Sequence, residues 1–462
     1  MRRRFSSPPL TVTARPRRIA PLVLLATLLG PGPGCGAFYR YHHDSPRFSL
    51  HTDLAQDFLD ETAPQVERML EGLSRLFDLD PQRLSKPTIV FKGKAADLDV
   101  IDHSYSPTLL GYYIPFWSYI AVDTSTAWTR ETSMLHQILL HEIAHHCIVT
   151  RYPEASRACW LNEGLAGNLE MTLFDAERFE TVLLNPLLLT IARQAVLVDA
   201  RRGDLQGLVG LSWRAFHNDP HKEIEYAISW SVVYFFLTER LADRGPLAAR
   251  IAALVELSPD AIVAAEPAWR RFLTQFDLTS RLIALARTAQ PDAGDWLTGR
   301  WAIQQLGSLR FLDDARAGEC LVELQDSPRS TVSAHASLAF LRFLARGPAE
   351  NVPTAVVDRG REQIQRILLD PQEPALLRAV LAGGTEGLPR TDRRWMPALI
   401  QLLDDPSSEV RTAAARALGT SLTKPTILNP SFWRDGEPTA RRQEFHEWKA
   451  YWASYRESSS RP

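Results

Sequence analysis

The strongest constraint on the fold is an apolar segment that carries His141, Glu142 and His145. Residues 137–149 read QILLHEIAHHCIV, and the apolar neighbours predict a long, largely buried helix rather than a surface helix with incidental polar residues. Positions i and i+4 lie one above the other on a helix, so both imidazoles share one face. Buried imidazoles and a buried carboxylate are costly without partners. Two histidines at this spacing can bind one zinc ion, and Glu142 would reach a water that the metal activates.

A further carboxylate follows in the segment WLNEG, where Glu163 lies 18 positions after His145. Two histidines and one glutamate leave a fourth zinc position open, which is typical of catalytic rather than structural sites. HExxH followed by NEG at this distance resembles the gluzincin metallopeptidases, whose third zinc ligand is that Glu. The resemblance covers about residues 45–250. It implies a zincin-like domain, Zn²⁺ as cofactor, and hydrolysis of peptide bonds with Glu142 as general base.

The same resemblance assigns two more residues. Glu170, seven positions after Glu163, would accept a hydrogen bond from a zinc-binding histidine. Tyr226, which precedes an apolar helix, would stabilise the oxyanion of the reaction, although an aromatic core residue is the alternative interpretation. The segment that binds the free amine in aminopeptidases is missing, so aminopeptidase activity is not expected. Residues 111–122, a segment rich in aromatic side chains, stand in its place. We expect a strand edge there that could pair with an extended peptide.

Other residues near these motifs have weaker interpretations. His146 points about 100° away from the ligand face, so it is expected to be a polar neighbour and not a ligand. Cys147 and Cys159 flank the site and could pair in an oxidising compartment, but two isolated thiols is the simpler interpretation. His217 and His221 lie in a polar loop, and a role for them near the site stays open because no motif assigns one.

The first 34 residues differ in character from the rest of the chain. Six arginines without an acid precede the apolar run Ile19–Gly30, which at about twelve residues is too short to span a bilayer. This pattern predicts a signal peptide over 1–34 and an exported protein, in a bacterial cell envelope or secreted. Cys35 resembles the lipidated cysteine of bacterial lipoproteins, although Gly32 replaces the usual aliphatic residue. Lipidation with a membrane tether and plain cleavage both stay open.

The charge balance excludes one class of partner. The chain has 52 basic and 54 acidic residues, and removal of the six leader arginines takes its net charge from −2 to −8. Nucleic-acid binding would need a concentrated basic face, which this acidic chain does not suggest.

The remaining pattern predicts an α+β domain over residues 45–290. It combines a small sheet with helices. The predicted elements are strands at 47–51, 88–92 and 111–122, bent at Pro115, and helices at 54–78 and 131–149. From 160 to 290 the pattern is helical, with loops at 200–222 and no further strand.

From about residue 296 the chain changes to short helices separated by acidic turns. The segment LDDPSSEVRTAAARALG, which begins at Leu403, resembles a HEAT repeat, in which small residues let paired helices approach. Similar copies begin at Leu324 and Leu369, and the marker residues Val332, Leu376 and Val410 are 44 and 34 positions apart, loosely within solenoid periods. The sequence therefore predicts an all-α HEAT-like solenoid over 296–425 and a helical tail over 426–462, with a generic helical bundle as the alternative.

These patterns favour an exported zinc metallopeptidase that acts on a peptide or protein substrate. Two alternatives stay open: a catalytically silent zincin-fold binding protein, or an envelope scaffold that acts through its HEAT-like module. That module would present a surface to a protein partner.

Overall fold

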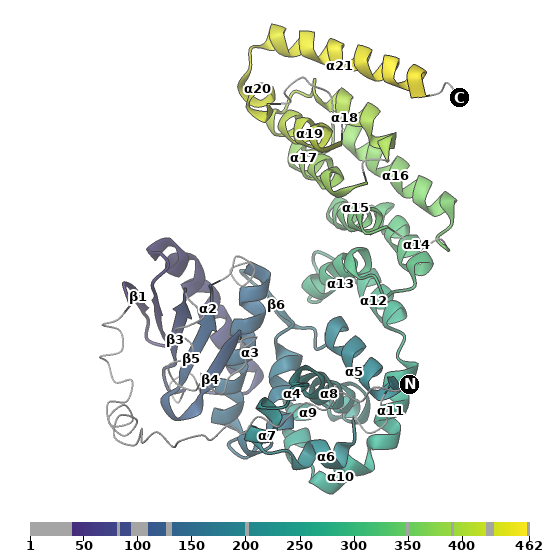
Figure 1. Cartoon of the computed structure of the whole chain (residues 1–462). Coiled ribbons are helices and arrows are strands. Elements are labelled where there is room, and N and C mark those ends of the chain that lie inside the picture. Colours follow the sequence, from purple (N-terminus) through teal and green to yellow (C-terminus); the bar gives the residue numbers. More distant parts are fainter. Residues whose placement is uncertain are drawn as a thin grey trace, which may run out of the picture. The chain divides into compact units, whose positions relative to one another are not determined.

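The computed structural model describes residues 39–80, 84–93, 110–125, 132–198, 203–347, 351–389, 392–421 and 429–459 (Figure 1). The predicted signal peptide and Cys35 lie outside these residues and stay predictions. The chain divides into two compact units. Residues up to Glu170 and 206–259 form the first, and residues 171–205 and 260–462 form the second. This division differs from the boundary near residue 296 that the sequence suggested.

A five-stranded sheet with the order β1-β2-β3-β5-β4 forms the base of the first unit. The three inner strands are parallel, and the edge strands β1 and β4 each pair antiparallel with their neighbour. The strands are β1 (Tyr41–Asp44), β2 (Ser49–Thr52), β3 (Thr88–Lys92), β4 (Gly111–Ile114) and β5 (Tyr119–Asp123). The sequence pattern found β2 to β5 but not β1, whose residues YHHD show no apolar alternation.

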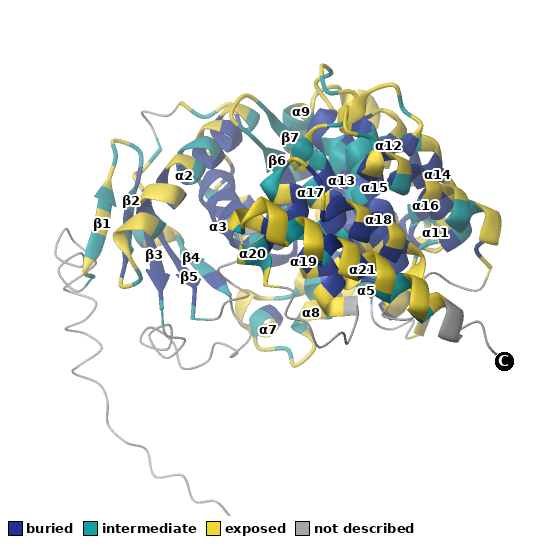
Figure 2. Cartoon of the chain, turned by 90° about the horizontal axis from the view of Figure 1, so that it is seen from above, coloured by how far each residue is buried: buried dark blue, intermediate teal, exposed yellow. Residues whose placement is uncertain are grey.

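Two helices, α2 (Gln56–Leu76) and α3 (Thr132–Arg151), pack against each other and against the sheet. Strands β3 and β5 are almost wholly buried, which Figure 2 shows in dark blue, whereas buried and half-buried residues alternate along β2. The ring of Phe91 on β3 meets Phe58 of α2 edge to face. Tyr112 and Trp117 cover Val90 on the opposite side of the sheet. Because side chains alternate along a strand, Gly111 and Tyr113 of β4 lie on the side of the sheet that faces α3.

Among the remaining helices of the first unit, α4 and α8 pack closely together. A Cβ on Gly164 of α4 would lie 2.6 Å from the carbonyl oxygen of Ser229 on α8, so only glycine allows this approach. Asn168 of α4 donates a hydrogen bond to the carbonyl oxygen of Trp230, at 3.0 Å. The helices are α4 (Cys159–Leu169), α6 (Leu205–Gly210), α7 (Trp213–His217), α8 (Lys222–Phe235) and α9 (Leu247–Val255). Short helices α6 and α7 thus occupy the region predicted as loop.

The second unit begins with a hairpin that the sequence analysis did not predict. Strands β6 (Thr172–Phe174) and β7 (Phe179–Thr181) pair antiparallel, which corrects the expectation of no strand between 160 and 290. Three residues are too few to show a periodic pattern. The carboxylate of Glu180 accepts hydrogen bonds from the backbone N–H groups of Leu297 and Thr298, which fixes the hairpin to the start of α13.

Helices make up the rest of the second unit, and many pack as neighbouring pairs. They are α5 (Pro186–Val198), α10 (Pro259–Ala264), α11 (Glu266–Gln275), α12 (Leu278–Arg287), α13 (Trp296–Ser308), α14 (Asp314–Gln325), α15 (Ser330–Ala345), α16 (Thr354–Leu369), α17 (Ala375–Gly384), α18 (Met396–Leu402), α19 (Ser408–Ser421), α20 (Pro430–Asp435) and α21 (Pro438–Ser459). Among the described residues, no helix is both long enough and apolar enough to cross a membrane.

Two of the three marker residues of the HEAT-like copies are buried. Val332 and Val410 are 2% and 0% exposed. Leu376 is 73% exposed, so the register predicted for the middle copy is wrong. The buried face of α17 instead carries Leu381 and Arg378, because Arg378 pairs with a buried carboxylate and takes the inward position.

Candidate metal centre

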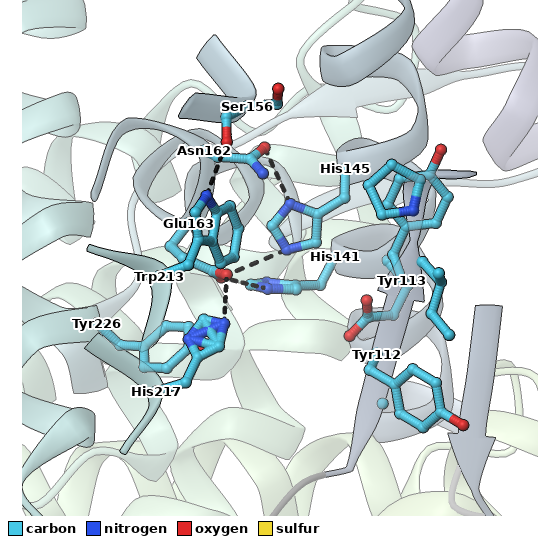
Figure 3. A pocket seen from close by; sticks show the side chains of 14 residues that line it. Tyr112, Tyr113, His141, His145, Ser156, Asn162, Glu163, Trp213, His217 and Tyr226 are labelled. Atoms are coloured by element: carbon cyan, nitrogen blue, oxygen red, sulfur yellow. Dashed lines mark hydrogen bonds and ion pairs between the residues drawn. The ribbon is translucent and has the colours of Figure 1, made fainter. Parts of the chain in front are cut away.

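Three segments of the first unit bring the predicted site residues together (Figure 3). His141 and His145 lie one helical turn apart on α3, and their rings meet edge to face with centroids 4.7 Å apart. Glu163 projects from α4 toward both rings. The third segment, α7 with the start of α8, supplies His217 and Tyr226. All five side chains line one cavity of about 360 Å³.

The separations between the donor atoms fit a metal ion. The Nε2 atoms of His141 and His145 each lie 3.3 Å from Oε2 of Glu163. Ligands about 2.0–2.1 Å from a tetrahedral zinc ion are separated from one another by roughly 3.3–3.4 Å. The three donor atoms lie within 4.8 Å of one another. Two imidazole nitrogens and one carboxylate oxygen therefore form a group that could hold a metal ion.

Both histidines are oriented by acceptors on their outer nitrogens. Nδ1 of His141 lies 3.0 Å from Oε2 of Glu170, and Nδ1 of His145 lies 3.1 Å from Oδ1 of Asn162. When Nδ1 donates to these oxygens, Nε2 of each ring keeps its lone pair for the centre. The position of Glu170 was predicted from the sequence, whereas that of Asn162, which stands beside Glu163 in the NEG segment, was not.

The electrostatics of the three side chains favour positive charge at the centre. Burial lowers the pKa of His141, but hydrogen bonds to Glu163 and Glu170 outweigh it, so the pKa lies well above the ordinary value. Burial raises the pKa of Glu163, but the charge of His145 and the hydrogen bonds to both rings lower it more strongly. The carboxylates thus stabilise a cation at the point where the histidines converge.

Glu142 lines the same cavity and is only 6% exposed. Burial raises the pKa of its carboxyl group. Its position depends on β4, because a Cβ on Gly111 would lie 2.9 Å from Oε1 of Glu142 and 2.9 Å from Cγ2 of Ile138. The edge strand therefore approaches the helix closely at the point where Glu142 faces the cavity.

A second contact fixes β4 to α3. The hydroxyl of Tyr113 and Nδ1 of His146 are 3.0 Å apart and hydrogen-bonded. His146 is fully buried, and burial lowers its pKa to about 4, so its ring is neutral. Gly111 and Tyr113, two positions apart on β4, thus contact Glu142 and His146, four positions apart on α3. His146 therefore holds the edge strand, and it is not a member of either donor group.

Sequence reasoning gave no role to His217, which the fold brings to the centre. Its Nε2 lies 3.5 Å from Oε1 of Glu163, whereas His141 and His145 contact the other carboxylate oxygen, Oε2. The ring stacks on Tyr226, with centroids 6.1 Å apart and planes 20° from parallel. Trp213, four positions earlier on α7, meets the His217 ring edge to face. A Trp and a His at i and i+4 were the local signal that this loop was a helix with a defined face.

A second group of donors shares Glu163. Cys159, Glu163 and His217 also offer three ligand atoms within 4.8 Å of one another. Cys159 and Cys147 are free, buried thiols, so no disulfide joins them. Burial raises the pKa of both thiols, that of Cys147 to about 12. Nδ1 of His217 has no hydrogen-bond partner among the described residues, so this group lacks the outer acceptors that orient His141 and His145.

Comparison with known proteins gives one match. The HEAT-repeat family model matches residues 396–422, which correspond to α18, α19 and the turn between them. This match confirms the prediction of a HEAT repeat at the last of the three copies. No curated protein and no solved structure matches the chain.

Proposed function

We propose that this chain is a zinc-dependent metallopeptidase that hydrolyses peptide bonds. One observation carries the proposal: the donor atoms of His141, His145 and Glu163 converge in a cavity that Glu142 also lines. In this proposal the two histidines and Glu163 hold Zn²⁺. A zinc ion bound there would polarise the scissile carbonyl and lower the pKa of water toward about 7.

Four other side chains would act on the substrate or on the zinc ligands. Glu142 takes the proton of the attacking water and passes it to the leaving amine. Tyr226 donates a hydrogen bond to the oxyanion, and His217, which stacks on it, is a second candidate donor. Glu170 orients His141 through its Nδ1. The positions of Glu142, Tyr226 and His217 in the lining of the cavity, and the contact between Glu170 and His141, support these roles.

The cavity supports an extended peptide as the substrate. Strand β4 is an edge strand, so one row of its backbone groups can pair with another chain. Among the described residues that line the cavity, the ionisable side chains are those of the site itself and two tyrosines. With no separate carboxylate there for a terminal amine, we propose cleavage within a peptide and not at its amino terminus.

The export of the chain, with or without lipidation at Cys35, is also part of the proposal. HEAT repeats present extended binding surfaces, so the match at 396–422 supports a protein partner for the second unit. In this proposal the helices of the second unit hold a partner or substrate, while the first unit carries the chemistry.

The first experiment measures zinc in purified residues 36–462. We expect one equivalent of zinc, which His141→Ala and Glu163→Ala both lose. His136→Ala is the matched control, because His136 lies on the same helix, is not part of either donor group, and should keep the metal. A folded protein without zinc, handled without chelators, would contradict the proposed centre.

The second experiment separates a peptidase from a silent metal-binding protein. Glu142→Gln should keep its zinc, because the substitution removes the base and not a ligand. Its rate of cleavage of a peptide library should fall at least roughly a hundredfold. If the wild-type protein binds zinc but cleaves no peptide, or if Glu142→Gln cleaves equally well, the chain belongs with the binding proteins.

A further inference from the structure

A second cavity lies wholly within the second unit and has a different chemistry. Its volume is about 720 Å³, within the usual range for ligand pockets. Helix α16, the turn Arg393–Trp395 before α18, and helix α21 contribute to its lining. Four arginines line it, together with the carboxylate of Asp392; they are Arg361, Arg393, Arg394 and Arg456. We call this cavity the arginine pocket.

Two carboxylates neutralise only half of these arginines. Asp392 pairs with Arg361 at 2.5 Å and with Arg394 at 3.5 Å. Asp358 pairs with the same two guanidinium groups, at 3.6 and 2.7 Å. Both carboxylates are therefore already paired with Arg361 and Arg394.

The structure records no ion pair between Arg393 or Arg456 and a carboxylate of the described residues. The guanidinium of Arg393 lies 4.4 Å from the ring centre of Tyr455, and that ring stacks on Trp452, with centroids 5.6 Å apart. The aromatic pair supports Arg393 from α21 but does not neutralise its charge. The pocket thus combines surplus positive charge with the aromatic side chain of Trp452.

The surplus is unusual for this chain. The sequence as a whole carries more acidic than basic residues, yet the four arginines here exceed the two neighbouring carboxylates by two charges. Like charges gathered in a concave site repel one another, and they raise the local concentration of anions. Guanidinium groups can bind carboxylate and phosphate oxygens through two parallel hydrogen bonds. Arg361 and Arg394 already bind carboxylates, those of Asp392 and Asp358.

We propose that the arginine pocket binds an oxyanion, a carboxylate or phosphate group, between Arg393 and Arg456. The apolar part of such a ligand lies on Trp452. This inference does not depend on the zinc site, which belongs to the other unit. It gives the second unit a defined ligand chemistry.

The test uses the purified protein with both units and isothermal titration calorimetry at low and at moderate salt. The probes are a hexaglutamate peptide and inorganic phosphate. We expect at least one probe to bind, more weakly at the higher salt. Arg393→Ala with Arg456→Ala should weaken binding about tenfold or more, because both charged donors are removed. Both side chains are exposed, and thermal unfolding checks that the variant remains folded.

Arg416→Ala with Arg434→Ala is the matched control. Both residues lie in the second unit, are exposed and do not line the pocket, so their loss removes the same charge elsewhere. Binding of hexaglutamate alone supports a peptide carboxylate as the ligand, and binding of phosphate alone supports a phosphate group. Absence of binding by both probes, or an equal loss in the control variant, overturns the proposal.

Discussion

The placement of Glu142 depends on a residue that has no side chain. Gly111 lies at the start of β4, opposite Glu142 on α3, and the hydrogen bond between Tyr113 and His146 holds the same strand to the same helix. A glycine is required here for close approach and not for an unusual backbone conformation, since Gly111 belongs to a regular strand. The edge strand therefore fixes the position of the carboxylate, whereas the three donor atoms belong to α3 and α4.

We predict that Gly111→Ala separates catalysis from metal binding. The added methyl group would displace the Glu142 carboxylate, and a misplacement of about 1 Å can cost roughly a hundredfold in rate. Zinc content should stay at one equivalent, since the donors remain. Peptide hydrolysis and metal analysis of the same preparation measure the two effects. Gly210→Ala is the control, because nothing lies within 4 Å of its added Cβ. Unchanged hydrolysis in Gly111→Ala would show that Glu142 adjusts freely.

At the scale of elements, one buried ion pair joins two successive helical hairpins of the second unit. Arg378 of α17 pairs with Asp405 in the turn between α18 and α19, and both side chains are about 5% exposed. Asp405 also accepts a hydrogen bond from the backbone N–H of Ser407, at 2.8 Å. The acidic turn that marks the HEAT-like copy in the sequence thus has a structural role. It supplies the carboxylate that compensates a buried guanidinium.

We predict that Arg378→Ala destabilises the second unit by about 3–5 kcal/mol, because it leaves the Asp405 carboxylate buried without its partner. Urea unfolding, followed by circular dichroism, measures the change in free energy. Arg416→Ala, an exposed arginine on the adjacent helix α19, should change the free energy by less than about 0.5 kcal/mol. A loss below 1 kcal/mol for Arg378→Ala would mean that water reaches the pair.

At the scale of the whole molecule, the proposed metal centre belongs to one of two compact units. A ligand that binds only the folded state stabilises the unit that contains its site, by about 2.7 kcal/mol at a hundred times the dissociation constant. Removal of zinc should therefore affect the two units unequally.

We predict two thermal transitions in scanning calorimetry, of which a chelator lowers only one. His141→Ala should melt like the chelated wild type and show no further response to chelator, because its donor group is incomplete. The unaffected transition belongs to the second unit, and Arg378→Ala should lower that one alone. Equal shifts of both transitions by the chelator would contradict a metal confined to the first unit.

Much of the local structure follows from the sequence, because periodic burial is encoded within each segment. The apolar pattern located α2 and α3 and the strands β2 to β5 to within a few residues. The spacing of His141, His145 and Glu163 singled out the side chains that the fold brings together, while the metal and the activity stay predictions.

Contacts between distant segments were decided only by the tertiary structure. His217 reaches Glu163 because α7 folds against the site, and Leu376 is exposed because Arg378 takes the buried face of α17. The hairpin β6–β7 exists as three-residue strands that Glu180 fixes to a helix more than a hundred residues later. A local pattern records which face of a segment is apolar. It does not record which of several polar partners, far away in the chain, will meet that segment when the core closes.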